Sequence, residues 1–80
     1  PNPVRQHTTL QISWETAEPI EILIHDATGR RVRHLIAGPG AAEVVWDARS
    51  DDGRRVGAGS YFYRMRSGDH RAAGSLRVLQ

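Results

Sequence analysis

The fold is decided by the stretch IEILIHDATGRRVRHLI, residues 20–36. In its first half an isoleucine stands at every second position, at Ile20, Ile22 and Ile24. A period of two is typical of a β-strand that has one face on a core and the other in water. The next residues, Asp26-Ala27-Thr28-Gly29, begin with a polar side chain and end with glycine, as tight turns do. The stretch therefore predicts two strands joined by a hairpin turn.

The second half of the stretch departs from strict alternation. After Gly29 the apolar spacing slips between Val32 and Leu35. An extra residue in one strand is the pattern of a β-bulge, so we expect a bulge in this strand. The segment Gly29-Arg30-Arg31-Val32 also recurs as Gly53-Arg54-Arg55-Val56. Two copies are too few for a repeat architecture, and we interpret them as one hairpin solution used twice.

Similar alternation continues through most of the chain. Alternating runs lie at residues 9–14, 42–46, 61–66 and 76–78, with turn residues between them. Short strands separated by turns every ~8–12 residues predict an all-β protein, a β-sandwich of about six to seven antiparallel strands. Its two sheets would bury the isoleucine row against aromatic rings. The expected core anchors are Ile22, Ile24, Trp46, Tyr61 and Tyr63.

Length and composition narrow the function classes. The chain has 80 residues, enough for one domain, and no cysteine, which excludes disulfides and thiolate metal ligands. All eleven basic residues are arginine and the net charge is only +2, so we expect no nucleic-acid partner. No apolar run approaches the roughly 18 residues of a membrane span. The chain opens on Pro1 rather than Met, and we expect a single module, residues 1–80, of a longer protein.

Two groups of titratable side chains are candidate metal ligands. Asp47, Asp51 and Asp52 carry the carboxylate oxygens that calcium binds, but they lack the spacing of an EF-hand loop. Caps on a turn are the simpler interpretation of these residues. The histidines have no ligand spacing, and we expect them at the surface: His7, His25, His34 and His70. We therefore expect no metal site and no cofactor.

A catalytic site is not expected either. Ser50, Asp51 and His70 are the residue types of a catalytic triad. Nothing in the sequence places them together, and so thin a domain offers no cleft that would exclude water. We expect a module that is not an enzyme.

Aromatic and basic side chains have two interpretations each. Four aromatic residues would form a sugar-stacking platform if they were exposed: Trp14, Trp46, Tyr61 and Tyr63. Their positions in the alternation of the strands predict instead that they lie in the core. Arg30, Arg31 and Arg33 would contact phosphate or acidic lipopolysaccharide. Solvated strand and turn arginines are the ordinary alternative.

The order of short motifs along the chain resembles that of a known family. The motifs are Pro1-Asn2-Pro3, Thr9-Leu10-Gln11-Ile12, Ile22-Leu23-Ile24-His25-Asp26, Thr28-Gly29-Arg30-Arg31-Val32-Arg33, Val45-Trp46-Asp47, Asp52-Gly53, Gly59-Ser60-Tyr61-Phe62-Tyr63-Arg64-Met65 and a short final apolar strand. They are similar to those of the C-terminal immunoglobulin-like domain shared by type IX secretion sorting domains and the flagellar hook-capping protein. The resemblance covers essentially all 80 residues. His25, Ser60 and Arg77 depart from it, where Tyr, Val and lysine are more usual in the family.

The resemblance implies an immunoglobulin-like sandwich at the C-terminus of a secreted bacterial protein, often a glycoside hydrolase such as a xylanase, or a peptidase. Such a module would be a monomer that directs its cargo to the cell surface, with the outer-membrane secretion or anchoring machinery as partner. Alternatives are a carbohydrate-binding module and a structural or assembly domain like that of the hook cap. Because strand addition supplies affinity through main-chain hydrogen bonds, we expect recognition by the final strand: Ser75, Leu76, Arg77, Val78, Leu79 and Gln80.

Overall fold

The computed structural model describes residues 8–79, which form six β-strands. In chain order these are β1 (Thr8–Gln11), β2 (Ile20–Asp26), β3 (Arg31–Ala37), β4 (Glu43–Trp46), β5 (Gly59–Ser67) and β6 (His70–Val78). Every paired strand is antiparallel to its neighbour. The all-β class expected from the alternation is therefore confirmed. The described residues form no helix that would be long and apolar enough to cross a membrane.

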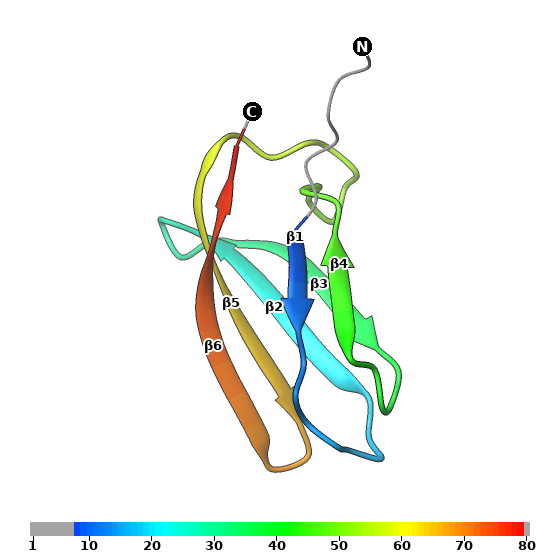
Figure 1. Cartoon of the computed structure of the whole chain (residues 1–80). Helices are drawn as coiled ribbons and strands as arrows, with labels where there is room; N and C mark the ends of the chain where they lie inside the picture. The colour runs from blue at the N-terminus through cyan, green and yellow to red at the C-terminus, as the bar shows by residue number, and fades with distance from the viewer. Residues whose placement is uncertain (1–7, 80) are drawn as a thin grey trace.

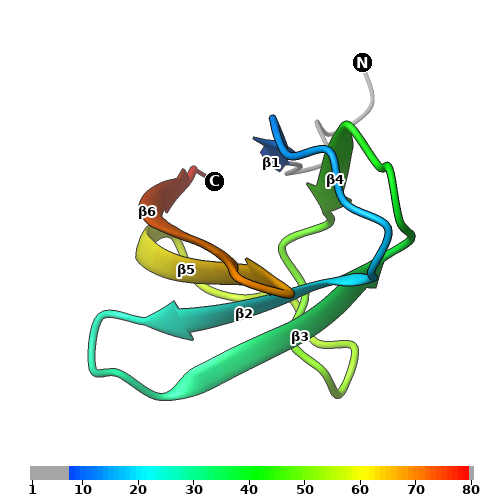
Figure 2. The same ribbon diagram turned by 90° about the horizontal axis from the view of Figure 1, so that it is seen from below.

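The strands form two layers of unequal size. One sheet has four strands in the order β3-β2-β5-β6, and the other consists of β1 and β4. The small sheet lies over one face of the large sheet (Figures 1 and 2). The large sheet therefore has an inner face that packs on a core and an outer face that no described strand covers.

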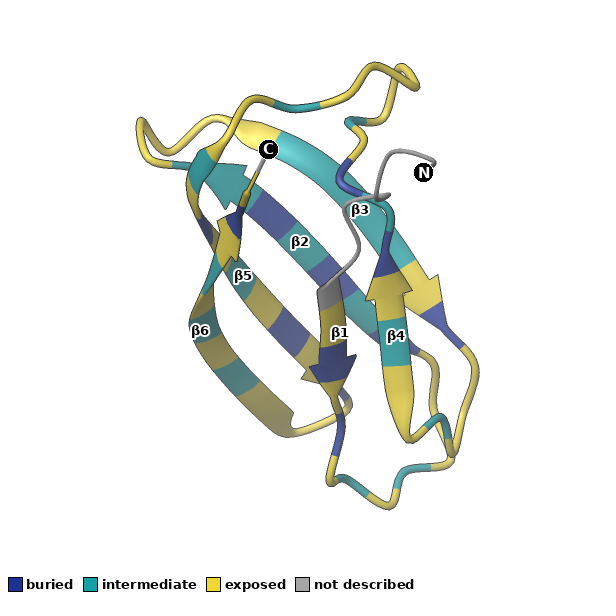
Figure 3. Ribbon diagram, turned by 45° about the horizontal axis from the view of Figure 1, so that its top comes forward, coloured by how far each residue is buried: buried dark blue, intermediate teal, exposed yellow. Residues whose placement is uncertain are grey.

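The core lies between the two sheets and is built on the isoleucine row of β2. Ile20, Ile22 and Ile24 are each 0% exposed, and Trp46 of β4 is as fully buried. Figure 3 shows the resulting alternation of buried and less buried residues along β2 and β5. The other buried apolar residues are Leu10, Ile12, Ala37, Ala48, Tyr61, Met65 and Val78. Each large side chain buried in this way contributes about 1.5–3 kcal/mol.

The two tyrosines of β5 lie elsewhere than the sequence predicts. Ile24 pairs with Tyr63 and Asp26 with Tyr61, so both tyrosines stand beside the isoleucine row in the same sheet. Tyr61 is buried, with its ring edge-on to that of Trp46 at 5.5 Å between centroids, whereas Tyr63 is only half-buried. The expectation that both tyrosines pack on the isoleucine row from the opposite sheet is wrong, because β5 is the neighbour of β2 in the same sheet. Tyr61 contacts the opposite sheet, through Trp46.

The predicted bulge lies in β3, and the loop after β4 covers it. Ile24 pairs with Arg33 and His25 with Arg31, which leaves Val32 as the extra residue. The N–H of Asp51 donates to the Val32 carbonyl at 2.9 Å, and Asp51 Oδ1 accepts from the His34 N–H at 3.0 Å. This part of the outer edge of β3 is therefore engaged by the chain itself.

The two Gly-Arg-Arg-Val segments follow turns of the same geometry. In the first, the N–H of Gly29 donates to the Asp26 carbonyl, and the N–H of Asp26 donates to the Arg30 carbonyl. Gly53 and Ser50 repeat this pattern in the second turn. The glycines have φ values of +90° and +88°, where a side chain would be strained. The interpretation of one hairpin solution used twice is confirmed.

Strand β6 is much longer than the sequence predicts. It begins at His70, whereas the apolar pattern indicates a strand only near Leu76 and Val78. A two-residue turn, Gly68-Asp69, joins it to β5, and Gly68 has a φ of +57°, as the first position of a type II′ turn requires. Pairing with β5 along its whole length, rather than apolar alternation, makes residues 70–75 a strand.

Candidate functional site

The outer edge of β6 is the part of the sheet left open for another strand. β6 is last in the order β3-β2-β5-β6, and no described strand pairs with its far side. Figures 1 and 2 show it at the margin of the sandwich. Unpaired N–H and C=O groups on such an edge are a ready template for strand addition. The edge of β3, by contrast, is partly covered by the loop that carries Asp51.

The turn geometry fixes which main-chain groups of β6 point outward. In a two-residue hairpin the closing pair, here Ser67 and His70, exchanges both hydrogen bonds, and bonded and non-bonded pairs then alternate. The residues in the non-bonded pairs direct their N–H and C=O groups away from β5. These residues are Arg71, Ala73, Ser75 and Arg77.

The predicted recognition residues divide between the two faces of this strand. Ser75 and Arg77 are exposed on the outer face of the sheet. Leu76 is half-buried and Val78 is buried, so both belong to the core side. Leu79 follows the strand and is 61% exposed. Gln80 lies outside the described residues.

Arginine side chains dominate the outer face beside this edge. Arg64 and Arg66 of β5 pair with Ala73 and Arg71 of β6, and all four residues are exposed. The acidic strand residue on this outer face is Glu21. Its carboxylate accepts a hydrogen bond from Arg66 and another, at 2.9 Å, from the His34 ring.

These hydrogen bonds have an electrostatic consequence. The bond from Arg66, with a smaller contribution from His34, holds the pKa of Glu21 below its ordinary value. Arg64, Arg71 and Arg77 form no ion pair with any described residue. Their charges are therefore available to an external anion.

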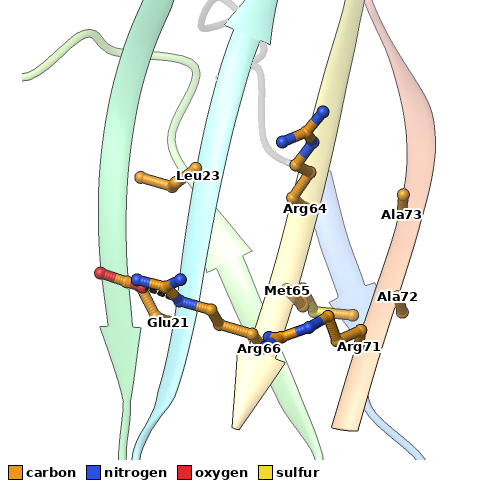
Figure 4. Close-up of a pocket in the computed structure, with 8 residues that line it drawn as sticks. All are labelled: Glu21, Leu23, Arg64, Met65, Arg66, Arg71, Ala72 and Ala73. Atoms are coloured by element: carbon orange, nitrogen blue, oxygen red, sulfur yellow. Dashed lines mark hydrogen bonds and ion pairs between the residues drawn. The ribbon is translucent and has the colours of Figure 1, made fainter. Parts of the chain in front are cut away.

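A hollow of ≈ 480 Å³ lies among these side chains (Figure 4). Arg71 reaches from β6 toward β5, Arg66 turns away toward Glu21, and Arg64 stands further along β5. Ala73, directly opposite Arg64, has too short a side chain to fill the space. The lining residues are Glu21, Leu23, Arg64, Met65, Arg66, Arg71, Ala72 and Ala73.

The sequence interpretation missed Arg64, Arg71 and Ala73 as site residues. Arg64 stands in the polar phase of a predicted strand, which could have indicated an outer face. Arg71 and Ala73 belong to the part of β6 that the apolar pattern did not show.

The candidate metal ligands already have protein partners. Asp47 accepts from Arg33 Nη1 at 3.2 Å, and Asp51 forms ion pairs with Arg31 and Arg33. Asp52 accepts from the Ser50 hydroxyl and the Arg54 N–H, and the Ser50 bond holds its pKa below the ordinary value. No three potential ligands within residues 8–79 are grouped to hold a metal ion.

The histidines are dispersed, and the triad residues do not meet. His34 bonds Glu21, while His70 stacks on Trp14 with ring centroids 5.1 Å apart. Ser50 instead donates to Asp52 and to a backbone carbonyl, and its loop lies at the opposite end of the sandwich from the β5–β6 turn (Figure 1). His25 is half-buried on β2, and His7 lies outside the described residues.

The aromatic side chains do not form a common exposed plane. Trp46 and Tyr61 are in the core, and Trp14 is half-buried against His70. Phe62, 45% exposed, is the large ring on the outer face of the four-stranded sheet. The three arginines that were candidate phosphate ligands have different surroundings. Arg31 forms an ion pair with Asp51 and Arg33 one with Asp47, whereas Arg30 is exposed in a turn.

Comparison with known proteins supports the sandwich architecture. The structure is similar to part of the crystal structure of dimeric latent PorU from Porphyromonas gingivalis, with a TM-score of 0.71 and 29% sequence identity. The match covers 100% of this chain and 9% of the PorU chain. No curated protein matches the chain.

A family model confirms the immunoglobulin-like part of the expected resemblance. The model described as FlgD Ig-like domain matches residues 5–71, which is most of the chain. The match contains all of β1 to β5 and only the start of β6. With this match and its two antiparallel sheets, the chain belongs to the FlgD Ig-like domain family.

Proposed function

We propose that residues 1–80 are a non-catalytic sorting and attachment module at the C-terminus of a larger secreted bacterial protein. The module directs this cargo, a hydrolytic enzyme, through the outer membrane to the cell surface. Its partner is the secretion or anchoring machinery of the outer membrane, which it meets as a monomer. The observation that carries the proposal is the open edge of β6.

Three features support an accessory role. The family is that of an Ig-like domain, and the similar part of PorU makes up only 9% of that chain. Ser50 and His70 have other partners, and no three potential metal ligands within residues 8–79 are grouped. The long edge of β6, nine residues from His70 to Val78, offers main-chain groups that a receptor strand would pair with.

The test uses a substitution that blocks the edge and spares the fold. Proline has no N–H and is tolerated on a strand only where that group faces outward. Because the Ser75 N–H points away from β5, Ser75→Pro removes a group that only an added strand would use. Ser75→Ala is the matched control, since it keeps the N–H.

Each variant is fused to an exported reporter in a bacterium that has type IX secretion, and the reporter is followed in periplasm, surface and medium fractions. We expect Ser75→Pro to leave the reporter in the periplasm and Ser75→Ala to reach the surface like wild type. Circular dichroism checks that both variants are folded. Normal surface delivery of a folded Ser75→Pro variant would refute recognition through this edge.

The carbohydrate-binding alternative is tested in parallel. Phe62 is the exposed ring on the outer face, and one ring offers little for stacking on a polysaccharide. Titration of the purified domain with xylan and cellulose should show no binding. Micromolar binding would contradict this expectation. Together with unaffected sorting of Ser75→Pro, it would replace recognition through the β6 edge by carbohydrate binding as the role of the module.

A further inference from the structure

We propose that the β6 edge accepts an extended partner segment in which acidic and apolar residues alternate. This inference rests on the proposed function and specifies the chemistry of the partner. It follows from the two different surfaces that flank the edge, one cationic and one apolar.

The outer side of the edge favours acidic side chains. The residues with outward main-chain groups, Arg71, Ala73, Ser75 and Arg77, also direct their side chains to the outer face. A strand paired there would place every second side chain beside them, because neighbouring strands lie about 4.8 Å apart. Neither Arg71 nor Arg77 has an ion-pair partner among the described residues, so a carboxylate beside either would gain one.

The hollow at Ala73 gives one acidic position a deeper site. A side chain beside Ala73 faces the gap that this small residue leaves, with Arg71 at one side and Arg64 across it (Figure 4). The strand residue Glu21 also lines this hollow, but its carboxylate already accepts hydrogen bonds from Arg66 and His34. A glutamate at this position of the partner would therefore approach two guanidinium groups that have no ion-pair partner within residues 8–79.

The inner side of the edge favours apolar side chains. Ala72, Gly74 and Leu76 alternate with the exposed residues and are only half-buried, at the margin of the core. An added strand would place its other side chains over them and bury apolar surface that β6 leaves accessible. Successive side chains of a strand point to opposite faces of the sheet. A partner strand that places carboxylates beside the arginines and apolar side chains over the core margin must therefore alternate acidic and apolar residues.

A peptide assay tests the pattern directly. The probe is Thr-Glu-Val-Glu-Val-Glu-Val-Thr, compared with its lysine version and with Thr-Val-Val-Val-Glu-Glu-Glu-Thr, which has the same composition without alternation. Titration of the whole chain is followed by nitrogen-15 NMR. We expect the alternating acidic peptide alone to bind, with shifts centred on the amides of Arg71, Ala73, Ser75 and Arg77. Equal binding of all peptides, or none, would overturn the proposal.

Charge variants locate the acidic site. Arg64→Gln combined with Arg71→Gln should weaken peptide binding roughly tenfold, since the double variant loses two exposed ion pairs to the peptide. Arg55→Gln, at an exposed arginine in the loop between β4 and β5, is the control and should leave affinity unchanged. An equal loss in both variants would mean that only net charge matters and would contradict the site. Binding of dextran sulfate in place of the peptide would instead assign the arginines to a polyanion.

The reporter assay separates this inference from the proposed function. If Ser75→Pro blocks surface delivery while Arg64→Gln with Arg71→Gln leaves both delivery and peptide binding intact, the edge is the recognition site but its acidic specificity is wrong. If a folded Ser75→Pro variant is delivered normally, recognition through the β6 edge fails, and with it the part of the proposed function on which this inference rests.

Discussion

At the scale of single residues, Trp46 holds the small sheet to the large one. It is 0% exposed, its ring is edge-on to Tyr61, and its Nε1–H donates to the Arg49 carbonyl at 2.9 Å. We expect Trp46→Ala to lower the free energy of unfolding by about 3–5 kcal/mol, enough to unfold a marginal domain.

Trp46→Phe is the milder comparison for this position. The Arg49 carbonyl also accepts from Arg33 Nη1, so it would not be left without a donor. Urea unfolding monitored by circular dichroism measures both variants. A loss below about 1 kcal/mol for Trp46→Ala would contradict the core role and return the indole to the surface.

Gly74 shows a second residue-scale requirement, that of close packing within a sheet. It pairs with Tyr63, and a Cβ added at Gly74 would lie 2.5 Å from the Tyr63 hydroxyl oxygen and 2.6 Å from the ring carbon that bears it. The ring therefore covers the glycine, and Gly74→Ala must displace it. We expect a loss of about 1–3 kcal/mol in the free energy of unfolding.

A double-mutant cycle tests the cause. In a Tyr63→Ala background the obstacle is gone, and Gly74→Ala should then cost little or stabilise the strand, since glycine lowers strand stability by about 0.5–1 kcal/mol relative to alanine. Equal costs in both backgrounds would mean that Tyr63 is not the reason for the glycine.

At the scale of elements, β2 and β6 mark the limits of sequence interpretation. The strand of Ile20, Ile22 and Ile24 could be predicted because burial on one face imposes a period of two. The first half of β6 could not, because its inward positions are Ala72 and Gly74 and carry little apolar signal. Backbone pairing with β5 makes these residues a strand, and this pairing cannot be recognised from the local sequence of β6 alone. The outer-face arginines were missed for the same reason, since the hollow needs β5 and β6 in register.

The conformation of the link from β1 to β2 is set by its contacts with the β5–β6 turn rather than by local sequence propensity. Ser67, buried at the end of β5, donates to the Glu18 carbonyl and bonds the Thr16 hydroxyl at 2.9 Å. Trp14 stacks on His70 from the same link. The predicted strand over residues 9–14 is shorter than expected and ends at Gln11. Trp14, Thr16 and Glu18 contact the residues at the β5–β6 turn instead.

At the scale of the whole molecule, carboxylates in both repeated turns couple folding to pH. The Thr28 hydroxyl and the N–H groups of Arg30 and Thr28 hold the pKa of Asp26 below its ordinary value of 3.8. Asp52 is held below the same value, first by the Ser50 hydroxyl and then by the Arg54 N–H. A carboxyl with a lower pKa in the folded state binds protons less readily there than in the unfolded chain. Its contribution to stability is therefore complete above pH 3.8 and is lost as the pH falls through the folded-state pKa.

We accordingly expect the urea midpoint of wild type to fall as the pH is lowered from about 5 to 2, the range in which carboxyl groups titrate. The comparison is the double variant Asp26→Asn and Asp52→Asn, whose side-chain oxygens still accept the turn hydrogen bonds but do not titrate. Its midpoint should fall less steeply, because the two turn carboxyls no longer titrate. The repulsion among the eleven arginines is present in both proteins. The difference between the two slopes measures the turns alone. Parallel slopes would show that the turn carboxylates do not couple to folding and that acid acts only through net charge.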